Sequence, residues 1–200
     1  KHNGRIGDIN QWKSKQTIDQ LIERYGKYTD DIIREFGKAY PKKDPAKALY
    51  VDVFMRKPHK DLCKMRVEQN CADTYNWMLS LDMPCYGETT PWHNADEAYI
   101  FHHAEFFESE YIPGISEKLQ DEMAGALVSF AYTGNPNHKG LPKWNVAEKD
   151  VIPTMIFDKE TEEKINYDDK LIELVEKAGA LGPGDKGPER LYGGGTRLHI

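Results

Sequence analysis

The sequence predicts an α/β protein whose central sheet is incomplete within these 200 residues. Apolar side chains recur at helical spacing in several segments, whereas only residues 75–81 and 151–158 have the pattern of strands. Two strands do not make an independent sheet with helices on both faces. We therefore predict that other strands of the same sheet lie outside this chain.

Composition limits the classes of function. The hydrophobic fraction is 39%, enough for a folded core. The net charge is −6 with no basic stripe, which argues against a nucleic-acid partner. No run of eighteen apolar residues predicts a membrane span. Three cysteines without CxxC spacing indicate a reducing compartment, and we expect a cytoplasmic protein.

Two helices are predicted near the start. The first opens with a capping box, in which Thr17 and Gln20 satisfy each other's amides, and it ends at Gly26. The second starts at Thr29, and Pro41 ends it. The side chains predicted to face the core are Ile18, Leu21, Ile22 and Tyr25 in the first helix, and Ile32, Ile33 and Phe36 in the second.

Residues 44–71 combine helical signals with one stretch of ambiguous pattern. Asp44 and Pro45 are typical of the cap and first turn of another helix. Residues 48–55 fit either a helix or a strand. After Pro58 a helical period continues towards Cys71.

The spacing of the apolar residues then changes from helical to alternating. In residues 75–81 apolar and other side chains alternate, which predicts a strand with one strongly apolar face. In residues 83–92, Pro84, Gly87 and Pro91 predict a loop. His93 stands at the end of this loop, and a short helix is predicted over residues 96–101.

Residues 116–133 carry the clearest helical pattern, stopped by the Gly-Asn-Pro sequence at 134–136. The predicted apolar stripe of this helix is Leu119, Met123, Leu127 and Phe130. A buried strand over 151–158 and an amphipathic helix over 168–177, with Leu171, Leu174 and Val175 inward, complete the pattern. We assign residues 1–178 to one domain and 179–200 to a Gly/Pro-rich tail.

The order of strand, loop, histidine and short helix indicates a chemical role for His93. Functional groups of open α/β sheets gather at the carboxyl ends of strands. An imidazole there can take a proton from a serine and return it to a leaving alcohol, as the last member of a Ser–acid–His triad.

The stretch PWHNADEAYIF resembles the histidine motif of type-B carboxylesterases, with His93, Asp96, Tyr99, Ile100 and Phe101 at the family's spacing. Other segments resemble the same family in the same order, over roughly residues 17–160: they are YVDVFMRKP, TYNWMLSLDMP, ALVSFAYTGNPN, LPKW and PTMIFD. The resemblance implies the C-terminal part of an α/β-hydrolase fold, an ester substrate, no cofactor, and His93 as the general base. It also implies a supporting role for Asp96, which we do not expect to be catalytic.

The resemblance is partial in a way that matters for catalysis. The family nucleophile lies in a G-x-S-x-G turn, and none of the serines here lies between paired glycines; they are Ser14, Ser80, Ser109, Ser116 and Ser129. The family acid is expected upstream, with Asp8 a poor substitute. The chain therefore resembles the histidine-bearing portion, inactive alone, and its expected partner is an N-terminal portion of the same esterase. Trp92 is a candidate to line the substrate pocket, with Tyr86 weaker.

Other interpretations compete with this one. His93, His102, His103 and Glu105 do not have a metal-binding spacing, and we expect no metal. Cys63 or Cys85 could replace the serine in a thiol hydrolase, although inert buried cysteines are commoner. A non-catalytic fragment or interaction module that keeps the esterase fold would share most of the matching residues, since these are packing positions.

Overall fold

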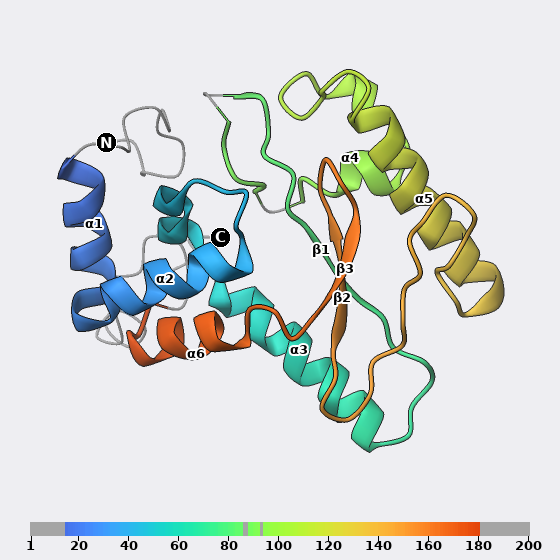
Figure 1. Ribbon diagram of the computed structural model, residues 1–200. Coiled ribbons are helices and arrows are strands. Elements are labelled where there is room, and N and C mark those ends of the chain that lie inside the picture. Colours follow the sequence, from blue (N-terminus) through green and yellow to red (C-terminus); the bar gives the residue numbers. More distant parts are fainter. Residues whose placement is uncertain (1–14, 86–87, 93, 181–200) are drawn as a thin grey trace, which may run out of the picture. The chain divides into compact units, whose positions relative to one another are not determined.

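The computed structural model describes residues 15–85, 88–92 and 94–180. Within these ranges the chain forms two compact units (Figure 1). The first unit comprises the residues up to Lys57 together with those from Tyr167 onward, and the second comprises Pro58–Asn166. Each unit has its own hydrophobic core.

The first unit is helical. It contains α1 (Lys15–Tyr25), the 3-10 turn η2 (Gly26–Tyr28), α2 (Thr29–Ala39), the 3-10 helix η3 (Pro45–Tyr50), the start of α3 (Val53–Glu68), and α6 (Asp169–Lys177). Its core consists of Leu21, Tyr25, Ile32, Phe36, Ala39, Ala48, Val53, Leu171, Ile172, Leu174, Val175 and Ala180. The predictions of α2 and α6 are confirmed, as is the stop at Gly26, whose φ of +54° suits glycine.

Two predictions about α1 are wrong. The helix begins at Lys15, so Thr17 lies inside its first turn and does not cap it. Ile18 and Ile22 are 57% and 51% exposed, whereas Leu21 and Tyr25 are buried. The buried stripe of α1 is therefore narrower than the four apolar positions suggested, because a core contact needs a partner surface as well as apolar character.

Residues 48–55, whose sequence fits either a helix or a strand, contain the end of one helical element, η3, and the start of another, α3. The Asp44 carboxylate accepts a hydrogen bond from the Ala46 amide at 2.9 Å, which confirms the predicted cap of η3. The chain is extended at Val51 and then enters α3. Pro58 lies inside α3, so the helix continues through the position where a proline removes one backbone donor.

A buried polar cluster connects α3 to α6 in the first unit. The Arg56 Nε donates to Asp168 Oδ2 at 2.7 Å, and the two side chains are only 10% and 2% exposed. The hydroxyls of Tyr167 and Tyr40 lie 3.3 Å apart beside this pair. Burial, followed by the negative charge of Asp168, raises the pKa of Tyr40 to about 12. The Arg56–Asp168 ion pair is therefore largely removed from solvent.

The second unit contains a three-stranded sheet in the order β1 (Asn76–Leu79), β2 (Pro153–Phe157), β3 (Glu162–Ile165). β1 and β2 are parallel, and β2 and β3 are antiparallel. The two predicted strands are confirmed. β3 was not predicted, because its sequence EEKI is charged and mostly solvent-facing, and it is recruited by pairing with the buried β2.

One face of the sheet is covered by α5 (Ser116–Thr133), whose predicted bounds are confirmed. Met155 and Phe157 of β2 share a core with Leu119 and Met123 of α5 and with the short helix α4 (Glu97–Ile100). On the opposite face, the Asn76 amide donates to Thr154 Oγ1 at 2.8 Å across the strands. This buried bond favours the observed register over a shifted one.

The predicted stripe of α5 is only half correct. Leu119 and Met123 are buried, but Leu127 and Phe130 are 46% and 43% exposed. The C-terminal half of the helix therefore presents apolar side chains to an opening rather than to a filled core.

We predict that Gly125→Ala in α5 destabilises the protein. A Cβ at this position would lie 2.8 Å from the His138 ring, which is held by Nε2 donating to the Glu122 carbonyl at 3.0 Å and by the Gly140 amide donating to Nδ1 at 3.2 Å. Overpacking of this kind outweighs the helix preference of alanine, for a net loss of about 1–2 kcal/mol. Urea unfolding measures the change.

The matched control is Gly37→Ala in α2, where nothing lies within 4 Å of the added carbon. This variant should gain about 0.5–1 kcal/mol from the helix preference alone. Equal stabilisation by both substitutions would show that the His138 ring does not restrict position 125.

Candidate active site

The segment that leaves the carboxyl end of β1 is closed by a backbone bridge. The Met83 amide donates to the Thr89 carbonyl at 2.8 Å, and the Thr89 amide donates to the Met83 carbonyl at 3.1 Å. Met83 itself is fully buried. The chain is therefore fixed on both sides of the loop tip before it reaches position 93.

His93 lies outside the described residues, as do Tyr86 and Asp8, so the structure does not test these predictions. Its neighbours on both sides are described. The Ala95 amide donates to the Trp92 carbonyl at 3.2 Å, and the Glu97 amide donates to the Asn94 carbonyl at 3.1 Å. Asn94 has a left-handed φ of +69°, which asparagine tolerates better than most residues. Trp92 is 41% exposed, and its proposed contact with substrate stays a prediction.

The short helix after position 93, α4, is held in place by buried side chains. Ala95, Ala98 and Tyr99 are buried, and the Tyr99 hydroxyl donates to the Glu110 carbonyl at 2.6 Å. Asp96 occupies the N-cap position of α4 without a side-chain capping bond. It lies where a negative charge favours the helix dipole, although a four-residue helix makes that effect small.

Glu110 is an unexpected buried acid in this region. Glu110 is only 5% exposed, and its Oε2 has no hydrogen-bond partner in the part of the chain that the structure describes. Burial raises the pKa of Glu110 to about 7, with smaller contributions from the negative charges of Asp96 and Glu97. The carboxyl group is thus neutral in mildly acidic solution and becomes charged near neutral pH.

We predict that this group makes the protein less stable as the pH rises from about 5 to 8. In the unfolded chain the carboxyl loses its proton near its ordinary pKa of 4.5, whereas the folded state keeps it until about 7. The folded state is therefore progressively disfavoured between these values, by about 1–2 kcal/mol once solvent screening of the partly hydrated carboxyl is allowed for. Urea unfolding of the protein and of Glu110→Gln at pH 5 and pH 8 should show a smaller pH-dependent loss in the variant. Parallel losses in both proteins would contradict the prediction.

The other candidate residues have separate partners. His102 Nε2 lies 2.7 Å from Asp121 Oδ1, while the His103 ring is stacked against Phe101 and packs on Phe107. Cys63 is buried in a small cluster. Across the described ranges, no three His, Cys, Asp or Glu side chains converge as a metal site would require. No helix within those ranges has the length and apolar character needed to cross a membrane.

Sequence reasoning identified the histidine segment but missed Glu110. A glutamate between two aromatic-rich stretches carries no local pattern that indicates burial. The burial of Glu110 arises only in the folded chain, where its backbone carbonyl accepts from the hydroxyls of Tyr99 and Ser116 at 2.6 and 3.4 Å.

The parallel strand pair, the buried loop base and the α5 cover define part of an α/β-hydrolase fold. Residues 7–173 match the Carboxylesterase family, so the chain belongs to this family. Comparison with curated protein sequences gives no match.

Several solved esterases are similar in structure. An esterase from Clostridium hathewayi, described as able to hydrolyse aliphatic aromatic polyesters, is 35% identical with a TM-score of 0.77, over 82% of this chain and 33% of that one. A carboxylesterase of Geobacillus stearothermophilus is 15% identical with a TM-score of 0.55, over 86% and 38%. A PNB esterase is 16% identical with a TM-score of 0.54, over 81% and 33%. The chain thus spans about a third of these structures.

Proposed function

We propose that the complete protein containing this chain hydrolyses carboxylic esters, and that this chain supplies His93 as the general base. The observation that carries the proposal is the family match over residues 7–173, which includes the histidine motif at residues 91–101, after β1 and through α4. In this proposal, the nucleophilic serine and the acid come from a part of the complete protein that lies upstream in sequence. Asp96 supports the segment and does not react.

The proposed reaction has two stages. In the first, His93 accepts the serine proton as Oγ attacks the ester carbonyl, and then gives that proton to the departing alcohol as the carbon–oxygen bond breaks. In the second, His93 removes a proton from water as the water oxygen attacks the acyl-serine carbonyl, and it then returns that proton to the serine Oγ as the acyl–oxygen bond breaks and the carboxylic acid leaves. Trp92 beside it would line the pocket for the acyl or alcohol group.

A fluorophosphonate probe tests the covalent part of the proposal. Such a probe phosphonylates an activated serine, so intact and peptide mass spectrometry of the complete protein should locate one label outside these 200 residues. A label on Cys63 or Cys85 would favour the thiol hydrolase. A protein that takes no label and has no esterase activity would favour a non-catalytic module.

The substrate proposal follows the similarity to the Clostridium hathewayi esterase, which hydrolyses aliphatic aromatic polyesters. We propose that esters joining an aromatic acid to an aliphatic alcohol are accepted here. A dialkyl ester of a benzenedicarboxylic acid should be hydrolysed with a kcat/KM at least comparable to that of an aliphatic diester of similar length. A strong preference for the aliphatic diester would argue against this extension.

A further inference from the structure

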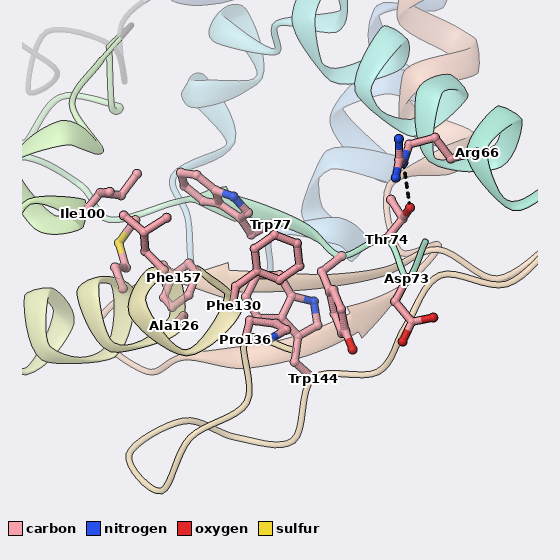
Figure 2. A pocket seen from close by; sticks show the side chains of 13 residues that line it. Arg66, Asp73, Thr74, Trp77, Ile100, Ala126, Phe130, Pro136, Trp144 and Phe157 are labelled. Atoms are coloured by element: carbon pink, nitrogen blue, oxygen red, sulfur yellow. Dashed lines mark hydrogen bonds between the residues drawn. The ribbon is translucent and has the colours of Figure 1, made fainter. Parts of the chain in front are cut away.

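A cavity of about 320 Å³ lies in the second unit, between the sheet and the C-terminal half of α5 (Figure 2). We call it the aromatic cavity, because its walls include the rings of Tyr75, Trp77, Phe130, Trp144 and Phe157. The residues at one end, Asp73 and Thr74, immediately precede β1. The histidine segment follows the carboxyl end of that strand, and Ile100 of its motif lines the cavity on the side opposite Arg66 (Figure 2).

The size of the aromatic cavity selects a small ligand. An apolar cavity of about 150 Å³ holds one benzene ring. A volume of about 320 Å³ therefore accommodates one or two fused rings with a short substituent. The exposed side chains of Leu127 and Phe130 lie at this cavity, which explains why the predicted stripe of α5 is not buried at its end.

The walls favour an aromatic ligand and are already in place. Tyr75 makes edge-to-face contacts with Phe130 and Trp144, at centroid distances of 6.1 and 5.8 Å. The Asn137 amide group holds the Trp144 backbone from both sides, accepting from its amide at 2.7 Å and donating to its carbonyl at 2.8 Å. Such rings offer further edge-to-face and stacked contacts to an inserted ring.

Two polar groups indicate what the ligand carries. Trp144 Nε1 is buried and has no hydrogen-bond partner among the described residues, so an N–H beside the cavity is available to an acceptor. At the opposite side from Ile100, Arg66 donates through Nε to Thr74 Oγ1 at 2.9 Å (Figure 2). That bond orients the guanidinium and leaves its terminal nitrogens for a planar anion, the geometry that carboxylates satisfy with two hydrogen bonds.

We propose that the aromatic cavity binds a one- or two-ring aromatic carboxylate, with the rings among the aromatic side chains and the carboxylate on Arg66. Asp73 also lies at this end, but it is exposed, and solvent screens its repulsion. The binding does not rest on the proposed ester hydrolysis and can be measured without it.

The test is calorimetric titration of the complete protein with 2-naphthoate, with its uncharged amide, and with 2-naphthylmethylammonium. 2-Naphthoate should bind with at least about tenfold higher affinity than either analogue, because a hydrogen-bonded charge pair contributes about one to two orders of magnitude. Arg66→Gln should remove this preference while leaving amide binding within about twofold. Arg34→Gln, at an exposed arginine outside the cavity, is the matched control and should change nothing.

A second variant tests the cavity itself while its thermal midpoint shows whether the protein is still folded. Leu127→Trp places a larger side chain at an exposed position of the cavity and should abolish binding of all three probes, with an unchanged thermal midpoint. No binding of 2-naphthoate at millimolar concentration, tighter binding of the ammonium probe, or unchanged affinity in Arg66→Gln would each overturn the proposal.

Discussion

Replacing His93 by Gln should lower kcat for ester hydrolysis by the complete protein by at least about 10³-fold. Glutamine has a similar size but cannot accept and return a proton near neutral pH, so both acylation and deacylation lose their base. KM should change much less, because the substrate contacts remain. Initial rates with a p-nitrophenyl ester, together with burst kinetics, measure both constants.

The control for this substitution is His59→Gln. His59 lies exposed on α3, so its replacement tests whether loss of any histidine disturbs the assay. Unfolding curves for both variants should match that of the parent protein. If His93→Gln retained activity within a few fold, the histidine assignment would be wrong even though the family membership stands.

Asp168→Ala should lower the free energy of unfolding by about 3–5 kcal/mol. Removing this carboxylate would leave the Arg56 guanidinium buried without its counter-charge, and an uncompensated buried charge is strongly destabilising. Tyr167 cannot compensate, because its hydroxyl lies 3.5 Å from Arg56 Nη2 and carries no charge. Urea unfolding, monitored by tryptophan fluorescence and circular dichroism, gives the difference.

An exposed ion pair in the same unit provides the comparison. Asp31 pairs with Arg34 in α2 at 2.5 Å, with both side chains about half exposed. Asp31→Ala should have a much smaller effect, because solvent screens an exposed pair and its entropy cost offsets most of the attraction. Restoration of most of the stability by the double substitution Arg56→Met with Asp168→Leu would identify the unpaired charge as the cause. Similar losses in Asp31→Ala and Asp168→Ala would contradict the argument.

Elements with strong local signals could be predicted from the sequence. The bounds of α5 follow from its apolar period and from Gly134, which adopts a φ of +74° at the helix end. β2 follows from a continuous apolar run that is buried at every position. The role of His93 is inferred from residue types and spacing that chemistry as well as packing sets, and it stays a prediction.

Features that depend on distant partners could not be predicted. β3 is a strand because β2 offers it a hydrogen-bonding edge, and its charged sequence gives no sign of this. Leu127 and Phe130 continue the apolar period of α5, yet in this chain they line the aromatic cavity and are about half exposed, which the period by itself does not reveal.

The sequence alone determined the family, the order of the principal elements and the position of the proposed base, because spacing along the chain carries that information. Tertiary structure decided the burial of Glu110, the Arg56–Asp168 pair and the aromatic cavity. Each of these depends on which residues meet after folding, and desolvation and ion pairing act between neighbours in space whatever their separation in the chain.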